Sequence, residues 1–133
     1  DWVAFDRGAS CAAVARSVLE PRKGEPQPYV TISFDRGRGR KGELSVALRR
    51  PSRAGSSVVM TIGEQPFLLG ARGARAWSRG PAQEQAIIAA IRGAGGMRVE
   101  ARDLAGRRTV DRYTLGGAPT AIDAAAAACL RGR

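Results

Sequence analysis

Histidine is absent from this chain of 133 residues, and lysine and cysteine each occur only twice. A zinc site needs about four ligands, and the two cysteines are not in a Cys-x-x-Cys pattern, so we expect no metal centre. A nucleophilic side chain would have no histidine as its base, and neither Gly-x-Ser-x-Gly nor Ser-x-x-Lys occurs. We therefore expect no catalytic residues and no cofactor, and we expect that this protein is not an enzyme.

Long apolar runs are also missing, and none approaches the roughly 20 residues that a membrane-spanning helix needs. The chain begins at Asp1 without a methionine or an apolar leader. That start suits a mature protein after removal of a signal peptide, and it equally suits a trimmed chain. The length predicts a single domain over residues 1–133, with enough residues for a hydrophobic core.

Aromatic residues make up only 5% of the chain, so we expect a core of Val, Ile, Leu and Ala. Alternating apolar and polar residues predict strands, most clearly over residues 29–34, where Val30, Ile32 and Phe34 share one face. The segment 74–78 is expected to carry Trp77 inward or into a pocket. Further strands are predicted over residues 2–5, 11–19, 43–49, 58–62, 66–69, 97–102 and 107–115, with 97–102 and 107–115 joined as a hairpin. In that hairpin Asp111 is expected to pair with Arg98 or Arg102, and the Tyr113 hydroxyl to lie at the edge.

Two segments have a helical period instead. The first begins at Pro81, a residue suited to the first helical position, and ends at the glycines of 93–96. The second is expected after Pro119, with Thr120 and Asp123 forming a box-like N-terminus. The spacing puts five of its residues on one face: Ile122, Ala125, Ala126, Cys129 and Leu130.

The two cysteines, Cys11 and Cys129, lie near opposite ends of the chain. Cys129 is on the apolar face of the second predicted helix, where Cys11 on an early strand could meet it. A disulfide is the expectation, and a pair of buried free thiols in a cytosolic protein is the alternative. The predicted fold class is mainly β with two short helices (α+β). We expect an antiparallel β-sandwich or open barrel whose C-terminal helix is tied by the disulfide.

The net charge is +10, and nearly all the positive side chains are arginines. A surface of this sign attracts polyanions without selecting among them. The loop of residues 35–42 contains a literal Gly-x-Gly-x-x-Gly pattern, but a strand is predicted after it rather than the helix that a dinucleotide site requires. The loop could instead contact an anion or be a solvated turn. Its candidate anion-contact residues are Arg36, Arg38, Arg40 and Lys41.

Several short segments, most of them in the second half of the chain, form a recognisable combination. They are residues 63–70 (GEQPFLLG), 76–78 (AWS), 83–92, 97–99 (MRV), 111–117 (DRYTLGG) and 121–129. Together they resemble the invasion-associated locus B family of alphaproteobacterial exported proteins. The opening Asp1-Trp2 and the early Cys11 are similar to the start of mature members of that family.

The chain differs from that family in having Ala118 where members usually carry phenylalanine, and in its low number of cysteines. The resemblance implies a signal-peptide-bearing β-sandwich in the periplasm or at the cell surface. It brings no ligand-binding residues with it.

We therefore expect a non-catalytic, periplasmic or secreted bacterial envelope protein. Its expected partner is a protein or an anionic component of the envelope or of a host surface. The alternative is a basic nucleic-acid-binding protein of the cytosol. Against that alternative, the arginines are not interleaved with aromatic residues along the sequence, and no RNP-like or helix-turn-helix pattern occurs.

Overall fold

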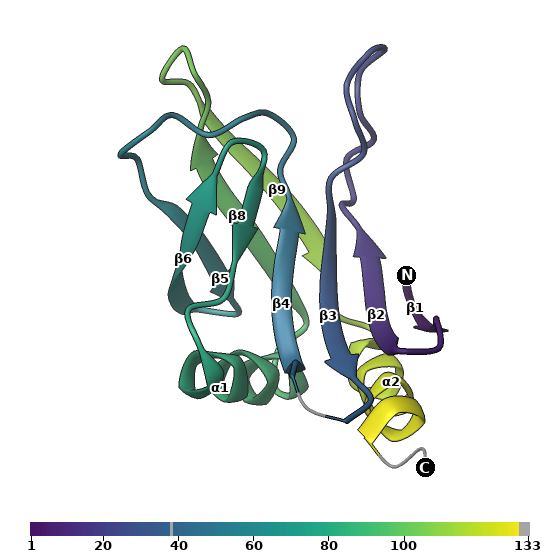
Figure 1. The fold of residues 1–133 in the computed structure, drawn as a ribbon. Helices are drawn as coiled ribbons and strands as arrows, with labels where there is room; N and C mark the ends of the chain where they lie inside the picture. The colour runs from purple at the N-terminus through teal and green to yellow at the C-terminus, as the bar shows by residue number, and fades with distance from the viewer. Residues whose placement is uncertain (38, 131–133) are drawn as a thin grey trace.

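The computed structural model describes residues 1–37 and 39–130, and it places nine strands in one antiparallel sheet. The order across the sheet is β1-β2-β3-β4-β7-β6-β5-β8-β9 (Figure 1). The strands are β1 (Trp2–Asp6), β2 (Ser10–Arg16), β3 (Tyr29–Asp35), β4 (Lys41–Ala47), β5 (Val58–Ile62), β6 (Gln65–Arg72), β7 (Arg75–Trp77), β8 (Gly96–Arg102) and β9 (Arg108–Thr114). The expected hairpin of residues 97–115 is confirmed as β8–β9.

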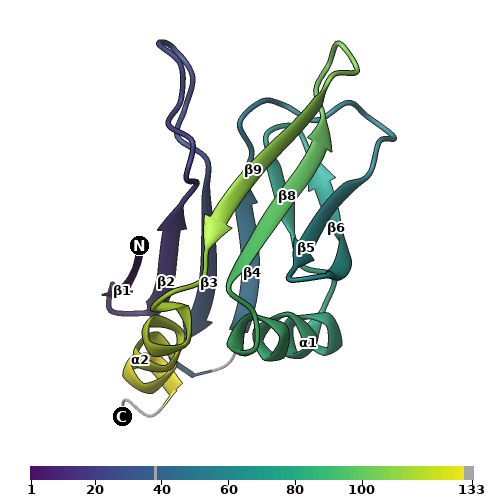
Figure 2. The same cartoon turned by 180° about the vertical axis from the view of Figure 1, so that it is seen from behind.

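The sheet curls so that its last strand returns toward its first two. The Val18 N–H donates to the Arg112 carbonyl at 2.8 Å, and the Trp2 indole N–H donates to the Thr114 carbonyl at 2.9 Å. Figures 1 and 2 show β9 running diagonally across the other side of the molecule from β3 and β4. The fold is thus a curled half-barrel, which confirms the expected mainly antiparallel β class and, of its two forms, the open barrel.

The two helices, α1 (Pro81–Arg92) and α2 (Ala118–Leu130), lie at the same end of the curled sheet (Figure 2). Pro81 is in the first turn of α1, as expected, and the helix ends at Gly93. The backbone N–H of Arg79 donates to the Gln83 side chain, and the Ser78 hydroxyl donates to Glu84, so two side chains of α1 reach back to its start. The helix α1 packs on β4, while α2 packs on β1, β2 and β3. No helix in the described ranges has the length and apolarity to cross a membrane.

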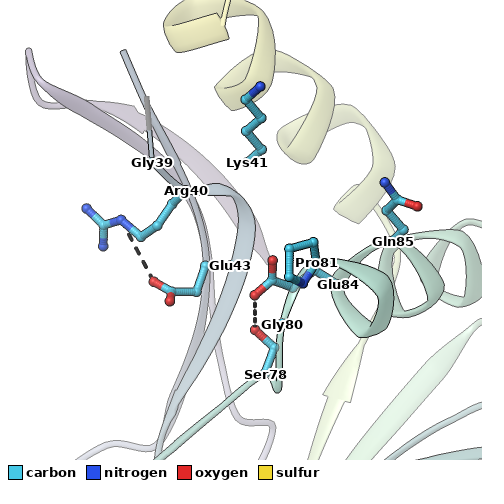
Figure 3. A pocket seen from close by; sticks show the side chains of 9 residues that line it. All are labelled: Gly39, Arg40, Lys41, Glu43, Ser78, Gly80, Pro81, Glu84 and Gln85. Carbon is cyan, nitrogen blue, oxygen red and sulfur yellow. Dashed lines mark hydrogen bonds and ion pairs between the residues drawn. The ribbon is translucent and has the colours of Figure 1, made fainter. Parts of the chain in front are cut away.

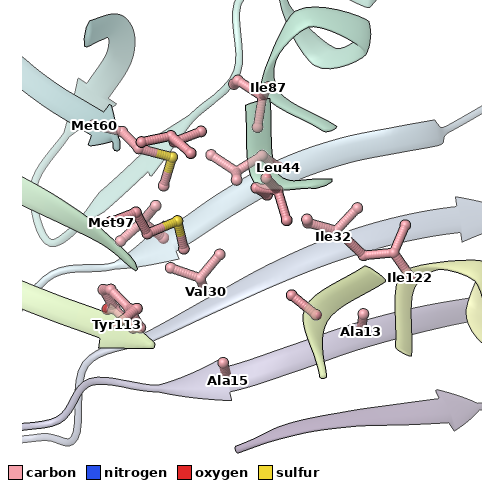
Figure 4. Packing of buried hydrophobic residues seen from close by; sticks show 14 of the residues in the cluster. Ala13, Ala15, Val30, Ile32, Leu44, Met60, Ile87, Met97, Tyr113 and Ile122 are labelled. Atoms are coloured by element: carbon pink, nitrogen blue, oxygen red, sulfur yellow. The ribbon is translucent and has the colours of Figure 1, made fainter. Parts of the chain in front are cut away.

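The core lies between the inner face of the sheet and the two helices, and it is mostly aliphatic as expected. Figure 4 shows Val30, Ile32 and Leu44 of the sheet facing Ile87 of α1 and Ile122 of α2. These five side chains are at most 2% exposed. Two-residue alternation in the strands and the helical period in α1 and α2 place them on facing surfaces, where removal from water stabilises the fold.

A disulfide joins Cys11 of β2 to Cys129 in the last turn of α2, as the sequence predicts. The two Cα atoms are 5.7 Å apart, and the two residues are separated by 118 positions in the chain. Both cysteines are almost completely buried. The bridge therefore fixes the C-terminal helix across the first strands of the sheet.

The start of the C-terminal helix differs from the sequence prediction. The helix begins at Ala118, so Thr120 lies inside its first turn and does not act as the N-cap. The Ala121 N–H donates instead to the Gly117 carbonyl, and Asp123 binds Arg92 of α1. Leu130 is 41% exposed rather than packed on the core.

Three side-chain predictions are wrong, because the side chains of β7 and β9 face the opposite way to that expected. Trp77 points away from the core and is 40% exposed. Asp111 and Tyr113 point inward, so Asp111 cannot pair with Arg98 or Arg102, and it binds Arg49 instead. The Tyr113 hydroxyl is buried and has no hydrogen-bond partner within the described residues, and burial raises the pKa of this phenol.

Arg49 and Asp111 form a buried ion pair where the curled sheet meets itself. The pair is 2.8 Å apart, and the two side chains are 8% and 6% exposed. Arg49 also donates to the Leu19 carbonyl at 2.8 Å, which holds the segment after β2 against β9. Replacing one partner of a buried pair leaves the other charge uncompensated.

Reduction of the disulfide should destabilise the protein strongly. The chain-entropy description gives roughly 4–5 kcal/mol for a closed loop longer than about 100 residues, so the Cys11→Ser/Cys129→Ser variant should lose about that much unfolding free energy in urea. Oxidised and reduced wild-type protein provide a matched comparison with no substitution. Alkylation of unfolded, unreduced protein should label neither thiol. Labelling of both thiols would show that the bridge is absent.

Removal of the carboxylate in Asp111→Ala should cost about 3 kcal/mol of unfolding free energy, because Arg49 then stays buried without its closest partner. Asp123→Ala is the matched control, since it breaks an ion pair whose side chains are 45% and 62% exposed. Its cost should stay below about 1 kcal/mol. Urea denaturation of both variants measures the difference. Equal losses would mean that the Arg49–Asp111 pair does not stabilise the fold.

Candidate binding face

The Arg-rich loop between β3 and β4 and the first residue of β4, Lys41, include the four residues that the sequence singles out for anion contact. Of these, Arg38 lies outside the described residues. Gly42, the second residue of β4, has a φ of 111°, and a Cβ atom there would come within 2.7 Å of the Ile88 Cδ1 atom of α1. Strand β4 begins at Lys41, so a strand follows the loop, as predicted, rather than the helix that a dinucleotide site requires.

Arg36 joins three separate parts of the protein. Its guanidinium donates to the Gly8 carbonyl, to the Ala128 carbonyl at 2.6 Å and to the Asp6 carboxylate at 2.7 Å. Ala128 is in the last turn of α2, where carbonyl groups lack partners within the helix. Hydrogen bonds from the Gly8 N–H and from Arg36 lower the pKa of Asp6. Arg36 thus ties the β1–β2 turn to the end of α2, and each of its three nitrogens donates one hydrogen bond.

Arg40 and Lys41 do not converge on a common point. Arg40 binds Asp35 at 2.9 Å and lies 3.8 Å from Glu43. The hydrogen bond from Arg40 lowers the pKa of the Asp35 carboxyl group. Figure 3 shows Arg40 and Lys41 pointing in different directions. The structure therefore brings Arg36 and Arg40 to carboxylates and does not gather the described loop residues into a cationic site.

A cleft of about 380 Å³ lies beside this loop, between β4 and the start of α1 (Figure 3). Two of its polar side chains, Ser78 and Glu84, are occupied by local structure. The Ser78 hydroxyl donates to Glu84 at 2.6 Å, and its oxygen accepts the Leu44 N–H at 3.1 Å. Both contacts anchor the start of α1 to β4.

The larger feature is the outer face of the sheet, formed by the outward-pointing side chains of β1, β2, β3, β4, β7 and β6. A hollow of about 1040 Å³ lies over its β1–β4 part. The strand registers align the side chains in rows across the face. The central row contains Val3, Val14, Thr31, Ser45, Trp77 and Gly70, which are successive cross-strand partners.

The neighbouring row is strongly cationic, and we call it the basic row. It contains Arg16, Tyr29, Ala47, Arg75 and Arg72, again as successive cross-strand partners. Arg75 donates to the Tyr29 hydroxyl at 3.4 Å. Arg16, Arg72 and Arg75 are exposed, and none of them forms an ion pair within residues 1–37 and 39–130. Strands about 4.8 Å apart thus present three uncompensated guanidinium groups along one line.

Two exposed aromatic side chains lie on the same outer face, Phe5 on the far side of the central row from the basic row and Trp77 within the central row. Phe5 is 41% exposed, and the Arg7 guanidinium lies 5.4 Å from the centre of its ring. At the other side of the face, the Trp77 indole covers Gly70, where a Cβ atom would come within 2.7 Å of the indole nitrogen. Glycine at position 70 therefore lets the indole lie close to the strand. The outer face combines flat apolar surfaces with unpaired arginines.

Sequence reasoning missed this face because its residues come together only across strands. The alternation in residues 29–34 does put Tyr29 and Thr31 on the side away from the core. However, no single segment shows aromatic and basic residues interleaved, and the register that places Arg16 beside Tyr29 and Arg75 cannot be obtained from one strand alone. Trp77 is the local signal of this face, but its outward direction is not evident from a strand of three residues.

No protein-family model, no curated protein and no solved structure matches this chain in the comparisons. The function of the protein therefore has to be inferred from the geometry of the chain itself.

Proposed function

We propose that this protein is a non-catalytic, exported component of a bacterial envelope, related to the invasion-associated locus B proteins, and that its outer face binds an anionic polysaccharide. The observation that carries the proposal is the basic row, in which three arginines without ion pairs in the described part of the chain lie beside Tyr29 and the exposed Trp77. The disulfide supports export, because such bonds persist in oxidising compartments and are rare in the bacterial cytosol.

The chemistry of the face favours a ligand with both negative charge and flat apolar surfaces. Guanidinium groups match the geometry of carboxylate, sulfate and phosphate groups and bind them through paired hydrogen bonds. Aromatic rings offer an apolar surface on which the C–H face of a sugar ring can pack. A linear polysaccharide bearing uronate, sulfate or phosphate groups has both properties at regular spacing, as the rows of the face do.

The face is shallow and long rather than closed, and this shape favours a polymer over a small molecule. The hollow over β1–β4 extends from Asp1 and Phe5 at one side to Arg75 at the other. A small ligand is normally enclosed over most of its surface, whereas a polymer gains affinity from contacts spread along a strip. Single-stranded nucleic acid also binds sheet faces that carry basic and aromatic residues, so it is the competing ligand in the test.

Binding to heparin and alginate fragments should be measured against neutral dextran and oligo-dT, over a series of salt concentrations. Affinity for the charged polysaccharides should fall steeply with salt, and dextran should not bind. The Arg16→Ser/Arg75→Ser variant should bind about tenfold more weakly, because it removes two charges from the basic row. Trp77→Ala should also weaken binding.

The matched control is Arg22→Ser/Arg107→Ser, which removes the same charge from exposed positions outside the outer face. Its affinity should change less than about twofold. Equal losses in the two double variants would show that binding follows net charge rather than this face. Tight, salt-insensitive binding of dextran, or preference for oligo-dT over both charged polysaccharides, would contradict the proposed ligand class.

A further inference from the structure

Strand β1 is an unprotected edge of the sheet. It pairs with β2 on one side, and among the described residues it has no strand on the other. The opposite edge strand, β9, is different, because the carbonyls of Arg112 and Thr114 accept hydrogen bonds from Val18 and from the Trp2 indole. Proteins usually blunt a free edge with proline, lysine or a bulge. The segment Trp2–Asp6 has no proline or lysine, and its pairing with β2 is regular.

The backbone groups that point to the free edge can be identified. The Arg7 N–H donates to the Ser10 carbonyl, which closes the β1–β2 hairpin. In an antiparallel pair, every second residue exchanges hydrogen bonds with its partner, so the N–H and C=O groups of Val3 and Phe5 also point toward β2. The N–H and C=O groups of Trp2, Ala4 and Asp6 therefore point outward. No other backbone hydrogen bond engages them within the described part of the chain.

The side chains along this edge are apolar and exposed. Val3 is 49% exposed and Phe5 is 41% exposed, and both lie on the outer face. They are flanked on the same side by Asp1 and Arg7, which have opposite charges. The outward side chains thus run negative, apolar, apolar, positive along the chain.

This pattern is complementary to itself when the strand is reversed. An antiparallel register centred on Ala4 places Ala4 opposite Ala4 of the second copy, and Val3 opposite Phe5 of the second copy. The same register places Asp1 opposite Arg7 of the second copy, and the two-fold symmetry gives two such contacts in each dimer. It also places Trp2 opposite Asp6 of the second copy, and the backbone groups of both residues point to the free edge. About six backbone hydrogen bonds can therefore form between the copies. Registers centred on Val3 or Phe5 leave part of the strand unpaired and lose the charge pairing.

We infer that two copies of this chain associate through antiparallel pairing of their β1 strands, centred on Ala4. The contact has two-fold symmetry, because the same surface serves both copies. It covers Val3 and Phe5, and it joins the two outer faces into one continuous sheet surface. The dimer does not depend on polysaccharide binding, since it requires only the free edge of β1.

Sedimentation velocity over a range of protein concentrations should show a reversible monomer–dimer equilibrium. Asp1→Arg and Arg7→Asp should each weaken the dimer about tenfold, because each puts like charges opposite one another at two places. The double variant should restore the affinity. Arg7→Asp is the sharper single test: it lowers the net positive charge, so general repulsion between copies predicts a tighter dimer, whereas the register predicts a weaker one.

A cross-linking variant tests the register itself. Opposed residues in an antiparallel pair have Cα atoms about 5.5 Å apart, which is within the range of a disulfide, so Ala4→Cys should form covalent dimers under mild oxidation. Ala54→Cys, exposed in the loop between β4 and β5, is the control and should remain monomeric. Peptide mapping should show the Cys11–Cys129 bridge intact in both variants. A monomer at all concentrations, or a dimer that neither the charge exchange nor Ala4→Cys affects, would overturn the inference.

Discussion

The tie between α2 and the first strands is the constraint on which the rest of this structure depends. A curled sheet with an aliphatic core must be covered at its inner face, and α2 provides that cover for β1, β2 and β3. The helix itself is rich in alanine and has little side chain to bury. The Cys11–Cys129 bridge and the Arg36 contact with the Ala128 carbonyl both hold its last turn in place. Because β9 leads directly into α2, the same tie keeps the sheet curled.

The arginines of this chain have two separate roles, which composition alone does not reveal. Arg36, Arg49 and Arg50 bind carboxylates and carbonyls that join segments distant in the sequence. Hydrogen bonds from the backbone N–H of Arg107, and from Arg50 among others, lower the pKa of Asp103, as expected for a carboxylate held in its charged form. In contrast, Arg16, Arg72 and Arg75 face outward from strands of the sheet. Other described arginines also lack ion pairs and lie elsewhere on the surface, whereas these three share one row of the sheet.

The class of the fold was predictable from the sequence because local patterns determine which residues face inward. The alternation of Val30, Ile32 and Phe34 and the helical spacing of Ile87 and Ile91 each report one buried face. The disulfide was predictable because the chain contains only two cysteines. The partners of Asp111 and Trp77 were not predictable in this way. Arg49 is 62 positions from Asp111, and the strand order places β7 beside β4, so neither neighbour follows from local sequence.

The arginines of the loop after β3 bind carboxylates, whereas those of the basic row on the outer face do not, and the difference has a physical reason. A run of arginines in a loop is conspicuous in sequence, but a loop can fold back, and Arg36 and Arg40 reach carboxylates close by. Side chains on the outer face of neighbouring strands cannot fold back in this way. The pleated backbone keeps them at fixed spacings and directs them away from the sheet. Arginines in such a row stay unpaired unless a carboxylate is placed in the adjacent row. Here the central row supplies only Val, Thr, Ser, Trp and Gly. The central row therefore offers these arginines no acidic partner.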